Sequence, residues 1–403
     1  MPIKDATGPL KGLRVLDLTR VLAGPTCTQM LGDLGAEVIK IERPGAGDDT
    51  RGFAPPAMPG TDQSAYFIGV NRNKRSVTVD IAAAEGQKII RHLLEDTDIL
   101  VENFKVGALA KYDLGYEQVH AAHPGIIYCS ITGFGQTGPY APRPGYDALI
   151  QAMGGVMSLT GDITGEPQKV GIPVADVFAG LYGCIGILAA LRHREKTGQG
   201  QQVDIGMLDT HVAWLANQGM NYLATGENPP RLGNQHPNIV PYQVFPTADG
   251  YMVLSIGNDP TFKRFCEAFD LAHLLDDPRF ATNPARVENR QFVTDTLTPT
   301  MRARPTREWV EKLEALKIGC GPINTLKDVF ADPHVIARGM VIEMAHTSGV
   351  PVQVIANPVR LSETPADYRT APPVLGQHTE EILRDLLGMS ASEFNALKAK
   401  GIV

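Results

Sequence analysis

Strand-like and helix-like segments alternate through the first half of this 403-residue chain. Helical patterns run over 24–35 and 84–96, and a further one ends near His123. Six segments rich in Val, Ile and Leu have the composition of buried strands: residues 13–19, 36–42, 76–81, 98–103, 126–132 and 201–207. This alternation predicts an α/β fold with a parallel, doubly wound sheet, in which ligands bind at the C-terminal ends of the strands.

The chain changes character after the fifth predicted strand. Residues 132–155 are so rich in Gly and Pro that we expect a long ordered loop, followed by a helix from Asp176 to about Arg194. Beyond residue 226 the sequence predicts a β-hairpin turned by Ala-Asp-Gly and a helix that opens at Asp259. We therefore expect a large domain (1–200), a linker helix (201–225) that starts with the last strand pattern, a small α+β domain (226–325) and a tail (326–403).

Composition disfavours several classes of function. The formal net charge is -7 and there is no basic stripe, which argues against nucleic acid or an anionic membrane as a partner. The N-terminus has no apolar signal segment and no stretch approaches the roughly 20 uncharged apolar residues of a membrane span, so we expect a cytoplasmic protein. The five cysteines form no Cys-x-x-Cys pair and no Cys/His cluster, which predicts mostly buried thiols and no metal site.

A single carboxylate, Asp176, stands in the apolar stretch GIPVADVFAG, directly before a long apolar helix. This position predicts the N-cap or the first turn of the helix, where free N–H groups and the helix dipole favour an ionised carboxylate. Asp176 is therefore either a helix cap or a nucleophile toward an acyl group, and spacing does not choose between these roles. Gly180, Gly183 and Gly186 lie at intervals of three on the same helix, which predicts the close approach of another helix rather than of a ligand.

The common catalytic motifs are absent. The first strand-to-helix turn, TRVLAGPTC, lacks the Gly-x-Gly-x-x-Gly cradle, so a nicotinamide cofactor is disfavoured although Glu42 stands where the ribose-binding acid would. Arg43 follows, and a cation there suits a phosphate or nucleotide, the alternative being a solvated surface arginine. The chain also has no Gly-x-Ser-x-Gly, no Walker loop and no His-Glu-x-x-His, which disfavours the usual hydrolases, kinases and metalloenzymes.

Several motifs in a fixed order resemble one family over essentially the whole chain. They are LRVLDLTRVLAGPTCTQMLGDLGAEVIKIERPGAGDDTR, NRNKRSVTVDI, VENFKVGAL, GYDALIQAMGG, GIPVADVFAG, HREKTGQGQQVDIGMLD, CGPINTLKDVFADPHVIARGM and PVLGQHTEEIL. Together these motifs resemble the class III CoA-transferases, the group of formyl-CoA transferase and carnitine CoA-transferase.

The resemblance implies a fold and a chemistry. The large domain would be Rossmann-like and completed by the C-terminal segment, the smaller domain α+β, and two subunits would interlock as a homodimer. The family's catalytic aspartate falls on Asp176, which favours the nucleophile over the cap. Its carboxylate would attack an acyl-CoA to give a mixed anhydride and then an aspartyl-CoA thioester, from which an incoming carboxylic acid receives CoA. Coenzyme A would thus be present as the substrate thioester, with no bound cofactor, ATP or metal.

The resemblance also assigns binding residues. By similarity the CoA contacts are Leu22, Ala23, Arg43, Val79, Asp80, Ile81, Ala82, Asn103, Phe104, Lys105, Lys111 and Tyr146. Leu22 replaces a glutamine of formyl-CoA transferase and Ala82 a lysine, so formyl-CoA and oxalate are disfavoured as substrates. In the small domain Gly257 and Asn258 stand where formyl-CoA transferase has a glycine-rich loop. That version looks more like relatives acting on succinyl-CoA and larger dicarboxylates, with His236 expected near the same pocket.

Two alternatives remain open. The α-methylacyl-CoA racemases share the fold and the aspartate but use a histidine in a Gly-His-Asp motif as a second base. Tyr146 occupies that place here, and a phenol is a poor base for exchange of an α-proton at neutral pH. The other alternative is a noncatalytic CoA-binding protein, which would keep the CoA contacts and dispense with Asp176.

Overall fold

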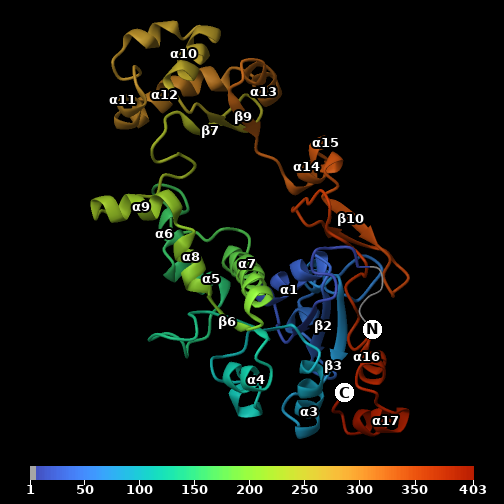
Figure 1. Cartoon of the computed structure of the whole chain (residues 1–403). Helices are drawn as coiled ribbons and strands as arrows, with labels where there is room; N and C mark the ends of the chain where they lie inside the picture. The colour runs from blue at the N-terminus through green and yellow to red at the C-terminus, as the bar shows by residue number, and fades with distance from the viewer. Residues whose placement is uncertain (1–5) are drawn as a thin grey trace. The chain divides into compact units, whose positions relative to one another are not determined.

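The computed structural model describes residues 6–403, which form two compact units. The large unit comprises the residues up to 156 together with 170–225 and 336–403. The small unit comprises 157–169 and 226–335. Figure 1 shows both units and labels many of their helices and strands.

The large unit contains most of the regular structure. Its elements are β1 (Arg14–Asp17), α1 (Ala23–Asp33), β2 (Glu37–Glu42), the 3₁₀ turn η1 (Asp49–Gly52), α2 (Ala65–Gly69), β3 (Lys74–Thr78), α3 (Ala84–Leu94), β4 (Ile99–Glu102), η2 (Ala110–Tyr112), α4 (Tyr116–Ala122), β5 (Ile127–Thr132), α5 (Asp147–Met153), α7 (Val174–Thr197), β6 (Gln201–Gly206), α8 (Met207–Ala213), α9 (Ala216–Thr225), β10 (Val341–Met344), β11 (Val352–Ile355), α16 (Thr379–Asp385) and α17 (Ala391–Ala399). Two short helices, α6 (Val156–Leu159) and α15 (Pro333–Ala337), lie across the unit boundaries.

Six parallel strands form the main sheet, in the order β3-β2-β1-β4-β5-β6. In the register of the three central strands, Leu16 of β1 lies opposite Ile39 of β2 and Leu100 of β4. This confirms the predicted parallel, doubly wound sheet. The strand order reverses between β1 and β4, and folds of this kind bind ligands in the crevice at that point.

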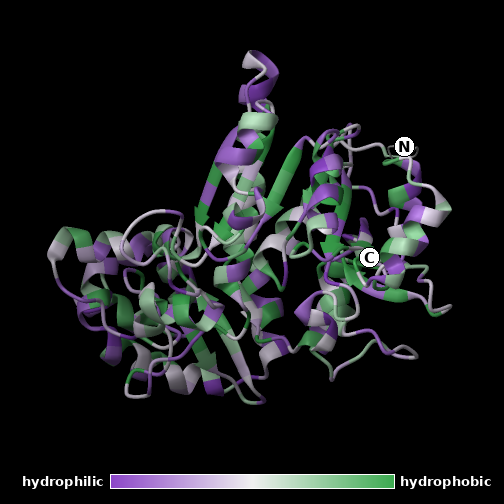
Figure 2. Ribbon diagram, turned by 90° about the horizontal axis from the view of Figure 1, so that it is seen from below, coloured by the Kyte–Doolittle hydropathy of each residue, from purple (hydrophilic) through white to green (hydrophobic). Residues whose placement is uncertain are grey.

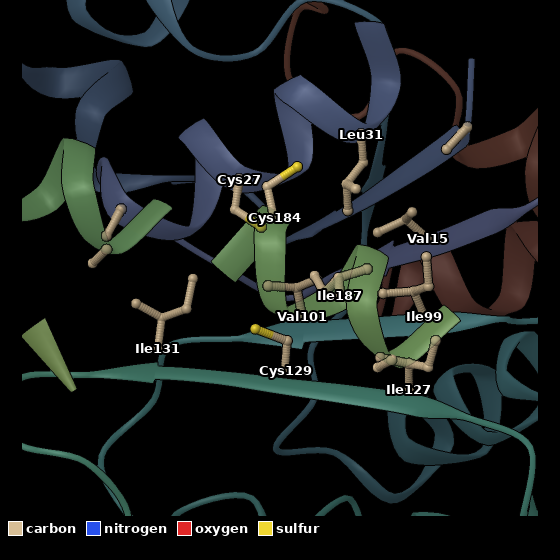
Figure 3. Close-up of a cluster of buried hydrophobic side chains, with 14 of the residues drawn as sticks. Val15, Cys27, Leu31, Ile99, Val101, Ile127, Cys129, Ile131, Cys184 and Ile187 are labelled. Atoms are coloured by element: carbon tan, nitrogen blue, oxygen red, sulfur yellow. The ribbon is translucent and has the colours of Figure 1, made fainter. Parts of the chain in front are cut away.

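An apolar core covers each face of the sheet. On one face α1 and α7 pack over residues such as Val15 and Val101, and Cys27, Cys129 and Cys184 lie in the same core (Figure 3). Burial raises the pKa of these three thiols, which confirms the prediction of buried cysteines for them. The other face is covered by α3, α4 and the C-terminal helices α16 and α17. Figure 2 shows strands of the sheet largely in the hydrophobic colour, whereas the helices carry both colours.

Helix α7 is the long apolar helix predicted after the loop. By length and composition it could cross a membrane, contrary to the expectation that no such stretch exists, but half of its most apolar window is buried inside the protein. Gly180 and Gly183 permit the close packing of α1: a Cβ on Gly180 would lie 2.6 Å from the Ala23 carbonyl oxygen, and one on Gly183 3.2 Å from Cys27 Sγ. The predicted approach of another helix is thus confirmed at both glycines, whereas Gly186 faces the sheet at Val203.

The C-terminal segment packs against the edge strand β3 of the main sheet. The His378 N–H donates to the Ser76 carbonyl at 2.9 Å, and the Thr78 N–H donates to Thr379 Oγ1 at 3.0 Å. An ion pair of 2.6 Å joins Arg75 to Glu381. Residues some 300 positions apart in the sequence therefore meet here, which is the return of the C-terminal segment that the resemblance implied.

The small unit is an α+β structure. Its elements are β7 (Tyr242–Pro246), β8 (Tyr251–Ser255), α10 (Asp259–Ala268), the 3₁₀ turn η3 (Ala272–Asp276), α11 (Asn283–Glu288), α12 (Arg290–Arg302), α13 (Thr306–Ala315), β9 (Gly319–Pro322) and α14 (Leu326–Ala331). Strands β7 and β8 form the antiparallel hairpin expected from the Ala-Asp-Gly turn, and β9 extends it to three strands. Phe262, Phe265 and Trp309 lie fully buried in its own core.

The structure differs from the sequence-based expectations in three segments. The stretch 132–155, expected as a loop, contains α5, because its Gly and Pro residues cluster before Asp147 and leave a short helical run. Residues 201–206 pair with β5 as a strand of the sheet rather than belonging to a linker helix. The rest of the expected linker helix is interrupted between α8 and α9, and Ala216, the first residue of α9, has a φ of 46°.

Candidate active site

The ligand crevice expected at the strand reversal lies where β1 and β4 end. Asn103, directly after β4, accepts the Arg20 N–H on Oδ1 at 3.0 Å and donates from Nδ2 to the Arg20 carbonyl at 2.8 Å. One amide side chain thus satisfies both backbone groups of Arg20 and ties together the loops after β1 and β4. Asn103 was predicted as a CoA contact, and the structure places it at the crevice as a clamp between these loops.

A cavity of about 310 Å³ opens at the C-terminal ends of β1, β2 and β3. Seven of the predicted CoA contacts line it: Arg43, Val79, Asp80, Ile81, Ala82, Phe104 and Lys111. Arg20, which the motifs did not single out, adds a third exposed cation to Arg43 and Lys111. Apolar walls with cations at an exposed edge suit a ligand that combines an aromatic or aliphatic body with phosphates.

Two buried ion pairs support the floor of this cavity. Lys40 Nζ lies 2.9 Å from Asp48 Oδ2 and Lys74 Nζ lies 3.1 Å from Asp17 Oδ2, with all four side chains fully buried. Burial alone would raise the pKa of Asp17, but the charges of Lys74 and Lys40, together with hydrogen bonds from Thr19 and Thr28, lower that pKa to about 2. Asp48 Oδ1 also accepts the Val21 N–H at 3.1 Å, where this β-branched residue has a φ of 70°. The ion pairs therefore help to hold the turn after β1 in a strained conformation.

Glu42, at the end of β2, is occupied by structural contacts. Both of its oxygens accept hydrogen bonds from the Arg51 guanidinium, at 2.6 and 2.7 Å. Ser76 Oγ donates to one of these oxygens at 2.6 Å and the Asp48 N–H donates to the other at 2.9 Å. A ribose hydroxyl would have to displace these partners, which agrees with the missing glycine cradle in disfavouring a dinucleotide.

The predicted contact segment Val79–Ala82 is anchored on both sides. The Val79 N–H donates to the Glu42 carbonyl at 2.8 Å, and the Asp80 N–H donates to the carbonyl of Ile402 at 2.8 Å, near the end of the chain. Asp80 Oδ1 accepts the Ala82 N–H at 2.9 Å. The C-terminal return therefore helps to build this wall of the cavity.

Asp176 lies in the first turn of α7, which is one of the two positions that the sequence predicted for it. It is not the N-cap, which is Pro173, because the helix begins two residues earlier than its sequence suggested. Within residues 6–403 no group donates a hydrogen bond to its half-buried carboxylate. Burial and the charge of Asp147 raise its pKa from 3.8 to about 7, so these two effects oppose the ionisation that the helix end favours. A carboxylate without partners is poorly stabilised and available for attack on a carbonyl carbon.

Sequence reasoning missed the two side chains that support this turn. Asp147, the first residue of α5, accepts the Ala175 N–H on Oδ1 at 2.9 Å and the Gln151 Nε2–H on Oδ2 at 2.7 Å. Asp147 therefore caps a helix other than its own and presents a second carboxylate near Asp176. The only signal in the sequence was its place in the motif GYDALIQ, four residues before Gln151.

Tyr66 is a further group near the nucleophile that no motif indicated. It lies in α2 against Phe53, with the two ring centroids 5.5 Å apart. Partial burial raises the pKa of Tyr66, and the charges of Asp176 and Asp147 raise it further. Tyr66 is therefore a protonated hydroxyl in the field of both carboxylates.

The predicted contacts Leu22 and Ala23 lie at the start of α1, beside the helix that carries Asp176. The Ala23 carbonyl is the atom that a Cβ on Gly180 would meet, and Gly180 lies four residues after Asp176 on the same side of α7. Leu22 is the N-cap of α1 and supplies no side-chain hydrogen bond to it. The first N–H groups of two neighbouring helices are thus found on the side of the large unit where Asp176 lies.

The remaining predicted residues are placed elsewhere. Lys105 lines a separate cavity of about 320 Å³ with Glu102, and the Tyr146 side chain is 70% exposed outside both cavities. The others belong to the small unit, where Asn258 caps α10 by accepting the Thr261 N–H at 2.9 Å and Gly257 has open space around it. His236 stacks on Tyr242 with ring centroids 5.0 Å apart, and burial lowers its pKa.

No metal centre is found in the part of the chain that the structure describes. Among residues 6–403 no three His, Cys, Asp or Glu side chains form a set that could hold a metal ion. That no cofactor is needed stays a prediction.

Comparison with known proteins points to one family. The sequence pattern of CoA-transferase family III matches residues 10–379. The chain is 45% identical over 382 residues to the succinate–glutarate CoA-transferase of Agrobacterium fabrum, covering 94% of this chain and 96% of that protein. It is 44% identical over 395 residues to the succinyl-CoA:glutarate CoA-transferase of Homo sapiens, covering 98% and 90%.

A solved structure agrees with the sequence matches. The crystal structure of a CaiB/BaiF family protein from Brucella suis superposes with a TM-score of 0.84 at 46% identity, covering 94% of this chain and 100% of that chain. These matches confirm the resemblance that the ordered motifs indicated.

Proposed function

The chain belongs to CoA-transferase family III, and from this we propose that it moves CoA from succinyl-CoA to a dicarboxylic acid such as glutarate through covalent intermediates on Asp176. The name of the Homo sapiens relative carries succinyl-CoA and glutarate, and that of the Agrobacterium fabrum relative carries succinate and glutarate, which supports the choice of substrates. The observation that carries the mechanism is the half-buried Asp176 carboxylate in the first turn of α7, to which no group among the described residues 6–403 donates a hydrogen bond.

The first half-reaction loads the enzyme. An Asp176 oxygen attacks the thioester carbonyl of succinyl-CoA, the C–S bond breaks, and CoA thiolate leaves a mixed succinyl–aspartyl anhydride. The thiolate then attacks the aspartyl carbonyl of this anhydride, which releases succinate and leaves an aspartyl-CoA thioester. The pKa of about 7 leaves a substantial fraction of Asp176 ionised at neutral pH, and a more basic carboxylate is the better nucleophile.

The second half-reaction reverses these steps on the acceptor. A carboxylate of glutarate attacks the aspartyl thioester, forms a new anhydride and expels CoA thiolate. The thiolate attacks the glutaryl carbonyl, which yields glutaryl-CoA and restores the Asp176 carboxylate. One thioester replaces another, so the exchange is balanced without water or ATP.

CoA would bind with its nucleotide in the 310 Å³ cavity and its pantetheine arm directed past Leu22 and Ala23 toward Asp176. Arg43 and Lys111 would pair with the phosphates, and Arg20 would assist them. Backbone N–H groups at the start of α1, where Leu22 supplies no side-chain cap, would face the oxyanions that form during each attack. His236, Gly257 and Asn258 remain proposed contacts of the acceptor acid.

We also propose that the enzyme works as an interlocked homodimer in the cytoplasm. Large apolar side chains on α7 and α9 stand exposed in the single chain, including Ile185 at 59%, Met220 at 61% and Leu223 at 74%. Patches of this kind support burial against a second copy.

The test is conversion of succinyl-CoA and isotopically labelled glutarate into labelled glutaryl-CoA, followed by mass spectrometry. Asp176→Asn should lower kcat by about 10³-fold or more, because the amide cannot form the anhydride. The matched control Asp385→Asn, an exposed aspartate at the end of α16, should retain full activity. Transfer that survives in Asp176→Asn contradicts the covalent route, and deuterium exchange at the α-carbon of a 2-methylacyl-CoA without transfer would favour the racemase.

A further inference from the structure

Gln151 is a fully buried amide in α5 whose polar atoms are all engaged. Its Nε2 donates to Asp147 Oδ2 at 2.7 Å and contacts the Ile172 carbonyl at 3.4 Å. Its Oε1 accepts the Val170 N–H at 2.8 Å. One side chain, 0% exposed, therefore joins the second carboxylate of the site to the segment 170–172 that precedes the nucleophile helix.

These contacts matter because of where the segment 170–172 lies along the chain. Residues 157–169 belong to the small unit, so 170–172 is where the chain re-enters the large unit, a few residues before Asp176. This segment has no regular structure, and Pro173 at the N-cap of α7 supplies no side-chain cap. Asp147 performs the capping instead, through the Ala175 N–H.

We propose that Gln151 is a positioning residue. By holding Asp147 and the segment 170–172 together, it fixes the first turn of α7 and the placement of Asp147 relative to the Asp176 carboxylate. This inference rests on the proposed function, because it concerns the reactivity of Asp176 as nucleophile. Gln151 does not touch the substrate.

Glutamine is the side chain that these partners require. Asp147 needs a donor and the Val170 N–H needs an acceptor, and an amide supplies both from one planar group. Methionine has similar length but supplies neither, and asparagine supplies both on a side chain one methylene shorter. Because the site is buried, either change leaves polar groups that water cannot readily satisfy.

The expected consequence is specific to the chemical step. Displacing the nucleophile by about 1 Å should slow the chemical step on the order of 10²-fold. Gln151 does not line the proposed CoA cavity, so CoA should bind there as before. Asp147 would also no longer be held beside Asp176, so its charge would oppose ionisation of the nucleophile less. The pH at which loading becomes half-maximal should then fall.

The test compares Gln151→Met and Gln151→Asn with the wild type and with a matched control. The control is Gln291→Met, since Gln291 forms the same glutamine–aspartate pair four residues apart, to Asp295 at 2.8 Å, on an exposed helix face of the small unit. Each protein is mixed with succinyl-CoA from pH 5 to 9, quenched in acid, and assayed for protein-bound CoA by intact mass. Melting temperature and KM for succinyl-CoA are measured beside it.

We expect both Gln151 variants to load about 10- to 100-fold more slowly, with a half-maximal pH lower by about one unit and KM within about threefold. Gln291→Met should match the wild type. If either folded variant loads at the wild-type rate with an unchanged pH midpoint, the inference is overturned, and a lowered melting temperature alone would mark a merely structural residue. If Gln151→Met does not fold, the milder Gln151→Asn decides. A wild-type enzyme that never carries CoA would overturn the proposed function itself, and this inference with it.

Discussion

Lys40→Met tests whether the buried ion pairs support the fold beneath the cavity. Lys40 lies 2.9 Å from Asp48 with both side chains fully buried, and it also donates to the Thr19 carbonyl at 2.8 Å. Methionine keeps the length and removes the charge, so Asp48 is left buried without its cation. Breaking a buried pair in this way costs about 3–5 kcal/mol. For an m-value of about 3 kcal/mol/M, the urea midpoint of the large unit should fall by roughly 1–2 M.

The assay is urea unfolding followed by circular dichroism, with Lys400→Met as the control. Lys400 forms a pair with Glu85 at 3.2 Å, but these side chains are 61% and 43% exposed, so its loss should cost less than about 1 kcal/mol. The double variant Lys40→Met with Asp48→Asn should recover part of the loss, because no unpaired charge remains. Equal costs for the two lysine variants, or less than about 1 kcal/mol for Lys40→Met, would refute the reasoning.

Further predictions concern the site itself. The rate of CoA transfer should decline as the pH falls through about 7, because the pKa of Asp176 is raised to about 7 and only its ionised form attacks. Asp147→Asn should move this decline to lower pH. A pH profile of kcat/KM that is the same in wild type and in Asp147→Asn would contradict the electrostatic account. A carboxyl group whose pKa is higher in the folded than in the unfolded protein stabilises the fold at low pH, and this contribution is lost as the pH rises. Asp176→Asn should therefore raise the melting temperature more at pH 8 than at pH 5. Calorimetry at the two pH values measures this difference. Asn103→Leu removes the clamp on the loop after β1 and should raise KM for succinyl-CoA about tenfold with a smaller effect on kcat, and the reverse pattern in steady-state kinetics would argue against the clamp. Gly180→Ala places a Cβ 2.6 Å from a carbonyl oxygen of α1 and should cost about 1–3 kcal/mol in denaturant unfolding, whereas Gly69→Ala, with open space around it, should not; similar costs would show that α1 and α7 adjust freely.

The sequence predicted those features that local patterns encode. Apolar strands between helices were enough for the parallel sheet, and the approach of a second helix followed from Gly180 and Gly183. Strand β3 begins at Lys74, two residues before its predicted start, because a buried lysine does not resemble a strand residue. Its partner Asp17 lies on another strand, and this pairing exists only in the folded chain.

The support of the nucleophile could not be predicted for a similar reason. From its apolar surroundings alone Asp176 was placed at the N-cap or in the first turn of its helix, and the structure puts it in the first turn. Its environment depends on Asp147 and Gln151, which act through tertiary hydrogen bonds to residues 28 and 19 positions further along the chain. The transfer of residues 157–169 to the small unit likewise has no counterpart in composition or periodicity.

The central claim is that Asp176 carries the acyl and CoA groups during transfer, and trapping tests it most directly. The enzyme is incubated with succinyl-CoA, treated with hydroxylamine, digested, and analysed by peptide mass spectrometry. The account predicts a hydroxamate on the peptide that contains Asp176, dependent on succinyl-CoA and absent from Asp176→Asn. A hydroxamate on another residue, or complete transfer of CoA to glutarate with none on Asp176, would contradict it.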